Sequence, residues 1–277
     1  MKTLSLGYSP CPNDTYIFRA IAQGVVQSDQ VSLDIRLADV EELNVLASRG
    51  ALDISKVSAA AVTRMLDTYG VLPCGGALGY GCGPLLVARE SVALKDLRNA
   101  VIAIPGRRTT ANLLLELSGE HEGHKQEMLF SDIPRAVQSG QVDAGLIIHE
   151  SRFTYASLGL KKILDLGEWW EHNTGLPLPL GVIVARRDLG PEMARHLAGL
   201  IRQSIEHTRA HPDEAQAYIR GHAQEMEPGV ISEHIATFVN DFSLNMGPEG
   251  LRALEILLEK AFALEGKTLP GNILACD

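Results

Sequence analysis

A histidine at the end of an apolar run is the first residue of this chain that could do chemistry. His149 closes the predicted strand 143–149 and is followed directly by Glu150. The ordinary pKa of an imidazole is about 6.5, so a histidine can remove a proton near neutral pH. The same position also suits a structural histidine at the end of a strand. The local pattern therefore leaves a general base and a structural residue as equal alternatives.

Polar residues follow three further predicted strands in the same way. They are the segment SPCPNDT at 9–15, the residues Lys56, Val57 and Ser58, and the segment PGRRTT at 105–110. In an open sheet of parallel strands, the ligand crevice lies beyond the carboxyl ends of the strands. If the predicted strands are parallel, these polar segments and His149 converge on one cleft.

The segment SPCPNDT has two possible roles. Proline restricts φ, and Asn13 or Asp14 can cap the following helix, which together describe a stiff turn. The free N–H groups of that helix could also bind an anion while Asn13 and Asp14 bind hydroxyls. Cys11 is a candidate nucleophile, but no base lies near it in the sequence, so a buried inert thiol is favoured.

The segment IPGRRTTAN at 104–112 has the composition of a carboxylate-binding loop. Its glycine allows the backbone to approach a ligand closely. Thr109 and Thr110 begin a helix whose first amides have no intrahelical partner, so they can bind an anion. Arg107 and Arg108 add charge to this site or are solvated loop residues. The sequence does not decide between these roles for the arginines.

Two further segments carry weaker signals. The glycine-rich segment 75–84 fits neither common phosphate-loop pattern, and we interpret it as a flexible approach to the next strand. Trp169 and Trp170 lie together, and their rings could stack on a planar ligand or pack in the core.

The elements that must position these residues alternate between strand and helix from residue 4 to about residue 188, and helices follow to about residue 265. This alternation predicts an α/β fold with parallel-rich sheets. The predicted strands 84–90 and 181–188 both contain VAR and resemble each other. They predict a discontinuous first domain, 1–87 plus 185–277, with 88–184 inserted as a second domain. A substrate cleft would lie between the two domains.

Composition excludes several classes of function. The formal net charge of −9 and the lack of a Lys/Arg run argue against nucleic-acid binding. We find no signal peptide and no apolar run of membrane-spanning length, so we expect a cytoplasmic protein without membrane insertion. The four cysteines, Cys11, Cys74, Cys82 and Cys276, form no close CxxC pair. We therefore expect neither a metal site nor a disulfide framework.

Three separated motifs resemble one enzyme family. SPCPNDTYIF, GLIIHESRFTY and TGLPLPLG are similar, in this order, to segments of the 1,4-dihydroxy-6-naphthoate synthases of the futalosine route to menaquinone. VARRDLG, HPDEA and FSLNMGPEG extend the resemblance over nearly the whole chain. Tyr16 stands where the family often has Phe, a modest departure. The resemblance implies a two-domain fold similar to type II periplasmic binding proteins, with a central cleft.

The resemblance also implies a reaction. The substrate would be cyclic dehypoxanthine futalosine, and the products would be 1,4-dihydroxy-6-naphthoate and dihydroxyacetone. His149 falls on the family's general base, which would take a proton from the sugar-derived ring and let a three-carbon fragment leave. Aromatisation would drive the reaction without a redox cofactor or a metal, and the sequence contains no motif for either.

The implied substrate-binding segments fall on residues already singled out above. They are Lys56, Val57 and Ser58, together with Thr110 and Ala111. Thr109 and Thr110 suit the aromatic carboxylate of the substrate because they lie at a helix N-terminus. From the residues alone we add Asn13, Asp14 and Asn44 as candidates that bind the polyol.

Two alternatives belong to other functional classes. The first is a non-catalytic solute-binding protein for a small aromatic carboxylate, and the second is the ligand-sensing domain of a transcription regulator. The missing signal peptide argues against the first, and the acidic charge with no preceding helix-turn-helix argues against the second. The expected partner is a small molecule, with a homodimer possible. His149 discriminates between enzyme and binding protein, because simple binding needs no base.

Overall fold

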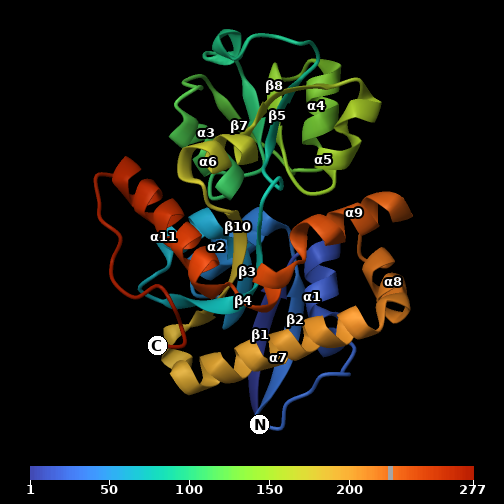
Figure 1. Ribbon diagram of the computed structural model, residues 1–277, viewed down its shortest axis with the longest axis vertical. Coiled ribbons are helices and arrows are strands. Elements are labelled where there is room, and N and C mark those ends of the chain that lie inside the picture. The colour runs from blue at the N-terminus through green and yellow to red at the C-terminus, as the bar shows by residue number, and fades with distance from the viewer. Residues whose placement is uncertain (224–226) are drawn as a thin grey trace.

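Two five-stranded sheets, one above the other in Figure 1, organise the computed structural model, which describes residues 1–223 and 227–277. The first sheet has the order β2-β1-β3-β10-β4, with β1 Lys2–Tyr8, β2 Val31–Leu37, β3 Ile54–Ser58, β4 Tyr69–Gly79 and β10 Leu178–Arg186. The second has the order β7-β6-β8-β5-β9, with β5 Leu85–Ala88, β6 Ile102–Ile104, β7 Lys125–Glu127, β8 Ala144–Ile147 and β9 Lys161–Asp165.

Helices cover both sheets. Those that pack on or near the first sheet are α1 Pro12–Ala22, α2 Val40–Ser48, α7 Pro191–Ala210, α8 Pro212–Arg220, α9 Pro228–Phe238, α10 Asp241–Leu244 and α11 Gly247–Leu264. Those that accompany the second sheet are α3 Thr110–Ser118, α4 Ile133–Ser139, α5 Ser151–Thr154 and α6 Leu166–Thr174. Within the described residues, no helix has the length and apolar character needed to cross a membrane.

Each sheet is mixed. In the first sheet β1 pairs in parallel with β2 and β3, and in the second β6 pairs in parallel with β7 and β8. β10 runs antiparallel to β3 and β4, and β5 runs antiparallel to β8 and β9. Strand–helix alternation predicts the parallel pairs. It misses the antiparallel direction of β5 and β10, because each enters its sheet directly after the chain crosses from the other sheet.

One strand is absent from the sequence-based assignment. The pattern from residue 59 to residue 70 indicates a helix, but only a short 3₁₀ helix, η1 Ala59–Arg64, forms before β4 begins at Tyr69. β4 contains Pro73 and several glycines, which disfavour strands locally. Pairing along β10, with register shifts around Gly181, holds this irregular segment extended.

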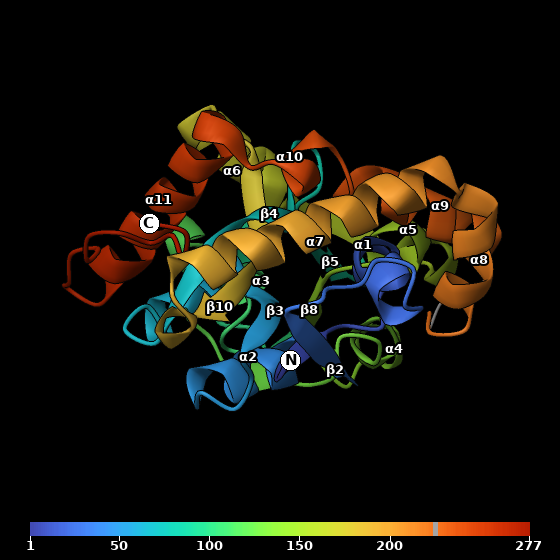
Figure 2. The same ribbon diagram turned by 90° about the horizontal axis from the view of Figure 1, so that it is seen from below.

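The core of the first sheet lies under α7, which crosses it next to α1 in Figure 2. The buried face of α7 includes Ala194, Leu197, Ala198, Ile201 and Ile205, a helical spacing of three or four residues. These side chains pack against buried residues of β1, including Leu4, Leu6 and Tyr8. The first sheet is therefore a rigid platform below the segments that follow β1 and β3.

The two crossings between the sheets lie side by side. The chain leaves the first sheet after β4 and returns through α6 to β10, and the Leu166 amide donates to the Pro84 carbonyl at 3.0 Å. A Cβ on Gly83 would lie 2.2 Å from the Gly167 Cα, so both crossings require glycine. We still propose a first domain of residues 1–87 plus 185–277 and an inserted second domain of residues 88–184. Both proposed boundaries fall within strands: β5 belongs to the second sheet and β10 to the first.

Candidate active site

A cavity of about 730 Å³, measured to its open mouth, lies where the two sheets face each other. Every site residue predicted from the sequence lines it except Asn44. The predicted residues on its wall are Asn13, Asp14, Lys56, Val57, Ser58, Thr109, Thr110, Ala111 and His149. Parallel strands β1, β3, β6 and β8 bring these segments together, because their carboxyl ends all point toward the gap between the sheets.

Asn44 lies behind the wall of the cavity and holds Ser58. Its Nδ2 donates to the Ser58 hydroxyl at 3.1 Å, and its Oδ1 accepts from the Ser58 amide at 2.8 Å. The Nδ2 of Asn44 also donates to Glu41 Oε2 at 3.1 Å. The structure thus gives Asn44 a supporting position for Ser58.

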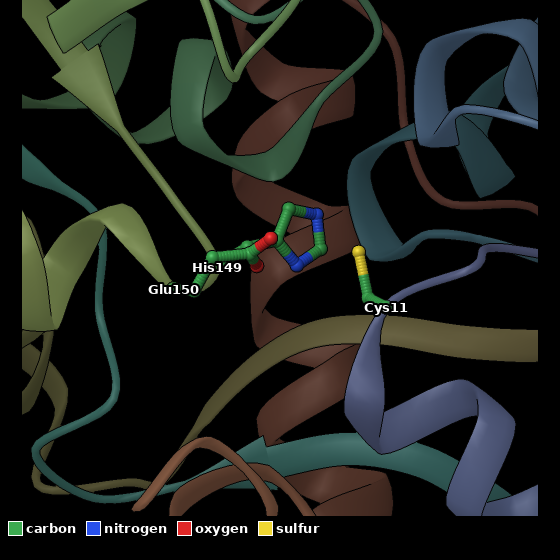
Figure 3. A group of neighbouring side chains, drawn as sticks. All are labelled: Cys11, His149 and Glu150. Carbon is green, nitrogen blue, oxygen red and sulfur yellow. The ribbon is translucent and has the colours of Figure 1, made fainter. Parts of the chain in front are cut away.

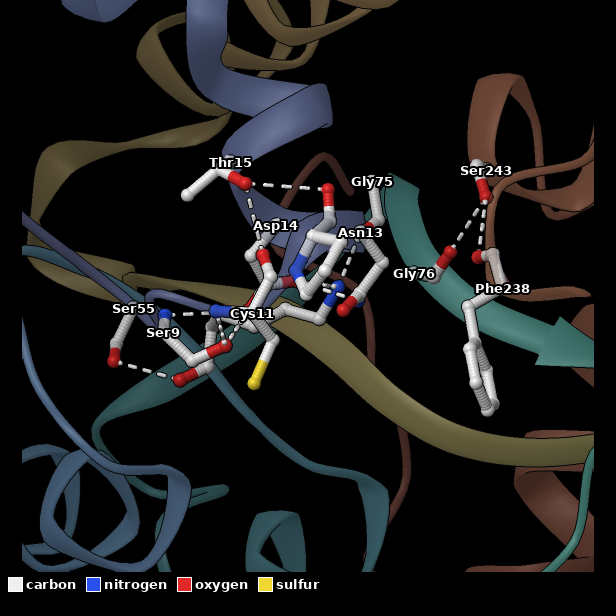
Figure 4. Close-up of polar contacts among 12 residues, drawn as sticks. Ser9, Cys11, Asn13, Asp14, Thr15, Ser55, Gly75, Gly76, Phe238 and Ser243 are labelled. Atoms are coloured by element: carbon white, nitrogen blue, oxygen red, sulfur yellow. Dashed lines mark hydrogen bonds and ion pairs between the residues drawn. The ribbon is translucent and has the colours of Figure 1, made fainter. Parts of the chain in front are cut away.

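The turn after β1 is a hydrogen-bonded network as well as a stiff loop. Asp14 accepts from the Ser9 hydroxyl at 2.7 Å and from Asn13 Nδ2 at 2.9 Å (Figure 4). Its Oδ1 also lies 2.9 Å from Lys56 Nζ, which donates to the Gly75 carbonyl at 2.8 Å. Because Asp14 neutralises Lys56, the lysine presents no free positive charge to a ligand. Asn13 and Asp14 are therefore structural parts of the cavity wall.

The N-terminus of α3 closes the opposite side of the cavity. Thr109 caps it, accepting from the Asn112 amide at 3.3 Å and donating to the Gly106 carbonyl at 2.7 Å. The amides of Thr110 and Ala111 stand at the first two helical positions, where no intrahelical acceptor exists. These two N–H groups and the positive end of the helix form a site suited to a carboxylate.

Thr110 also joins the two sheets. Its hydroxyl donates to the Leu180 carbonyl on β10 at 2.8 Å and accepts from the Ala60 amide at 3.2 Å. Arg108 makes a second connection, because its guanidinium lies 3.2 Å from Glu41 of α2. Burial of Glu41 raises the pKa of its carboxyl, although Asn44 and Arg108 both hydrogen-bond to it.

Three arginines lie near this region in different roles. Arg107 is exposed and pairs with Glu127 at 2.7 Å, and neither Arg107 nor Arg108 is part of the cavity lining. Arg152, which the sequence analysis did not single out, does line the cavity. It donates to the Gly81 carbonyl at 2.8 Å and pairs with Asp165 at 3.1 Å, so it fixes the first crossing segment. The glycine-rich segment is thereby part of the wall.

His149 has an unusual backbone. Its φ of 54° makes it the one non-glycine residue with positive φ within the described ranges. This conformation costs on the order of 1–3 kcal/mol and is concentrated at functional sites. Its ring packs against Phe130 at a centroid distance of 4.8 Å, and its Nε2 has no hydrogen-bond partner among the residues described. The fold thus places the His149 ring in the cavity wall, with a buried ring nitrogen that has no partner among the described residues.

His234 is the residue near His149 that the sequence analysis missed. It is fully buried on α9, its ring centroid lies 6.0 Å from that of His149, and its Nε2 lies 2.9 Å from Asn13 Oδ1. A signal for it exists, because Ile231, His234 and Phe238 share the buried face of one helix. A histidine on an apolar stripe needs a buried polar partner, but the sequence does not say which.

Cys11 lies close to His149 in space (Figure 3). The thiol sulfur of Cys11, one ring nitrogen of His149 and one carboxylate oxygen of Glu150 all lie within 4.8 Å of one another. Burial, reinforced by the nearby Glu150, raises the pKa of the Cys11 thiol well above its usual range, so the thiol stays protonated. A thiol must lose its proton before it can bind a metal ion, and the environment of Cys11 opposes that loss.

The tryptophans belong to the core. Trp170 is fully buried and donates through its indole N–H to the Pro177 carbonyl at 3.1 Å, and Trp169 packs against the same core. Neither is among the cavity-lining residues.

The two-sheet arrangement with a ligand-sized cavity between the sheets defines the class of the fold, which is that of the periplasmic binding proteins. The periplasmic aliphatic sulphonate binding protein of Escherichia coli superposes with a TM-score of 0.66 at 12% identity, covering 100% of this chain and 91% of the other. A solved structure of an Archaeoglobus fulgidus protein is much nearer, with a TM-score of 0.90 at 36% identity, covering 95% and 98%.

Residues 4–263 match the family described as Menaquinone biosynthesis, and the chain belongs to that family. A Streptomyces coelicolor protein named 1,4-dihydroxy-6-naphtoate synthase is 46% identical over 266 residues, which are 94% of this chain and 93% of that protein. A Thermus thermophilus protein of the same name is 51% identical over 265 residues, 95% of each chain. These relatives agree with the resemblance carried by the sequence motifs.

Proposed function

We propose that this chain is a 1,4-dihydroxy-6-naphthoate synthase that cleaves cyclic dehypoxanthine futalosine into 1,4-dihydroxy-6-naphthoate and dihydroxyacetone. The two relatives of this name, each aligned over more than nine-tenths of the chain, support the activity. The observation that carries the mechanism is the His149 ring, which lines the cavity and whose buried Nε2 has no hydrogen-bond partner among the described residues. A base at this position has no purpose in simple ligand binding.

The cavity offers two chemically different ends to such a substrate. The aromatic carboxylate binds the amides of Thr110 and Ala111, where the helix dipole and two N–H groups stabilise an anion without a further cation. The aromatic ring then lies against the apolar part of the lining, which comprises Val40, Leu43, Val57, Leu180 and Phe238. Ser58, held by Asn44, is placed to bind a hydroxyl or carbonyl of the substrate.

His149 acts on the sugar-derived ring. Its imidazole takes a proton from that ring, the ring opens, and a carbon–carbon bond breaks to release a three-carbon enediol fragment. The proton returns to this fragment as it becomes dihydroxyacetone, so the reaction is balanced in protons and involves no net oxidation. Formation of the second aromatic ring supplies the driving force.

The alternative is a solute-binding protein for a small aromatic carboxylate, which the fold alone would also allow. His149 argues against it for an energetic reason. A strained backbone and an unpaired buried nitrogen both destabilise the folded state, and neither improves the binding of an anion at α3. Such costs are retained where a reactive group must be held in place.

Chromatography of the reaction mixture tests the proposal. Purified protein is expected to convert the cyclic substrate to the naphthoate, whereas His149→Asn is expected to bind the substrate without turnover. Asparagine tolerates positive φ, so this variant keeps the backbone while removing the base. His172→Asn on the exposed face of α6 is the matched control and should retain full activity. Tight binding without conversion by the wild type would favour the binding protein, and normal turnover by His149→Asn would remove His149 as the base.

A further inference from the structure

Three hydrogen-bond-capable atoms without partners lie together beside the cavity. They are His149 Nε2, Glu150 Oε2 and His234 Nδ1, each buried and without a hydrogen-bond partner among the described residues. His234 Nδ1 lies 3.8 Å from Glu150 Oε2, and the two imidazole rings are nearly parallel at 10°. A buried polar atom left without a partner destabilises the folded state. A cluster of three therefore requires an explanation in terms of function.

The tautomer of His234 follows from a chain of hydrogen bonds that begins at Asp14. Asn13 Nδ2 donates to the Asp14 carboxylate at 2.9 Å, which turns Asn13 Oδ1 toward His234. That oxygen can only accept, so His234 Nε2, 2.9 Å away, must carry the proton. Complete burial lowers the pKa of His234 well below its usual range and keeps the ring neutral. The remaining nitrogen, Nδ1, is then a bare acceptor.

The Glu150 carboxylate consequently faces the lone pair of His234 Nδ1. No N–H group donates to it from that nitrogen. Its carboxylate is 6% exposed and has no other cation bonded to it among the described residues. The other charged and titratable groups described around the site are Asp14 and Lys56 in their mutual ion pair, Arg152 bound to Asp165, the protonated thiol of Cys11, and Asp39. Asp39 accepts from the Glu41 amide through Oδ1, and its buried Oδ2 has no partner among the described residues.

We propose that Glu150 strengthens His149 as a base, and that Asn13 locks His234 in the tautomer that leaves the charge of Glu150 undiminished. Glu150 and His234 are not part of the cavity lining, so they act through His149 as positioning residues. As His149 takes the substrate proton, an imidazolium forms beside an ionised carboxylate. An opposite charge nearby stabilises the charged form of such a group, and a carboxylate oxygen of Glu150 lies within 4.8 Å of an imidazole nitrogen of His149. This inference rests on the proposed function, since it assigns a partner to the proposed base.

Steady-state kinetics over pH give the first test. Glu150→Gln keeps the shape of the side chain and removes its charge, so kcat is expected to fall at least about tenfold with little change in KM. The acid limb of kcat/KM should move to lower pH, because the imidazolium loses the nearby negative charge. An unchanged acid limb in Glu150→Gln would overturn the proposal.

Two substitutions of His234 distinguish the proposed role of its tautomer from a merely structural role of the side chain. His234→Gln can keep the N–H donor to Asn13 while removing the Nδ1 acceptor, and it should leave the acid limb in place. His234→Asn places an amide near the former Nδ1, where its N–H can donate to Glu150. It should shift the acid limb downward as Glu150→Gln does. Equal behaviour of the two variants would mean that His234 only fills space, which would contradict the lock.

NMR of the free protein with ¹⁵N-labelled histidine makes the test independent of turnover. The wild type is expected to show His234 as the neutral Nε2–H tautomer. The pH at which the His149 signals change is expected to be lower in Glu150→Gln than in the wild type. If His149 titrates identically in both proteins, the inference fails whatever the activity. If the wild type shows these signals but converts no substrate, the proposed function fails while the coupling stands.

Discussion

Lys56 and Asp14 form a buried ion pair beneath the cavity, with Nζ and Oδ1 2.9 Å apart and side chains only 6% and 4% exposed. The pair links β3 to the first turn of α1 and sets the orientation of Asn13, and through it that of His234. A residue pair on the wall of the same cavity thus helps to set how the groups around His149 are arranged.

Removal of one partner of this pair should destabilise the protein strongly. Lys56→Met leaves the Asp14 charge buried without a counterion, which costs about 3–5 kcal/mol. Urea unfolding measures the loss. The double variant Lys56→Met/Asp14→Asn removes both charges and is expected to recover a large part of it. A double variant no more stable than Lys56→Met would contradict the uncompensated charge as the cause.

Cys11 should be dispensable for chemistry despite its position beside His149. Its thiol is held protonated by burial and by Glu150, so it is a poor nucleophile. Cys11→Ala is expected to keep turnover near the wild-type rate at a stability cost of about 1 kcal/mol. Cys82→Ala, which alters a second buried thiol and one that lines the cavity, is the control. A loss of activity by orders of magnitude in Cys11→Ala alone would restore the thiol as a candidate nucleophile.

Stability should fall in mild acid because of His234. The pKa of this ring lies well below its usual value in the folded protein, while in the unfolded chain it is about 6.5. The unfolded state therefore binds more protons, and the stability contributed by neutral His234 is present above about pH 6.5 and lost as pH falls below it. Denaturant midpoints between pH 5 and 8 should show a weaker decline for His234→Gln. The exposed His172→Gln serves as control, and an equal decline in all three proteins would refute the assignment.

Closure of the two sheets, with their helices, toward each other should depend on the contacts that Thr110 and Arg108 make. Thr110→Val removes the hydroxyl bonded to Leu180 and Ala60, and Glu41→Gln weakens the ion pair with Arg108. The double variant is expected to scatter X-rays as a more open particle without ligand and to close again with a non-reacting carboxylate analogue. Disruption of the exposed Arg36–Glu42 pair, which lies within one half, should change nothing. Identical scattering profiles for all proteins, with and without ligand, would exclude this opening.

Much of the site was predictable because its residues lie at the ends of strands and at the start of a helix, and the order of these elements can be predicted from the sequence. The ends of β1, β3 and β8 and the N-terminus of α3 had to meet if their strands were parallel, and the structure brings Ser58, Thr110 and His149 to one cavity. β4 was not predictable in this way. Its proline and glycines argue locally against a strand, and only the pairing with β10 makes it one.

The amino-acid sequence alone predicts the strand–helix alternation, the polar segments at the ends of the strands and the motifs that carry the family resemblance. The contacts of individual side chains are visible only in the folded structure. There Lys56 pairs with Asp14, Asn44 lies behind Ser58, and His234 lies next to His149. Asn13 and His234 are 221 residues apart in the chain. No local pattern encodes which buried polar groups become partners over such a separation, because that choice depends on the packing of α1 against α9.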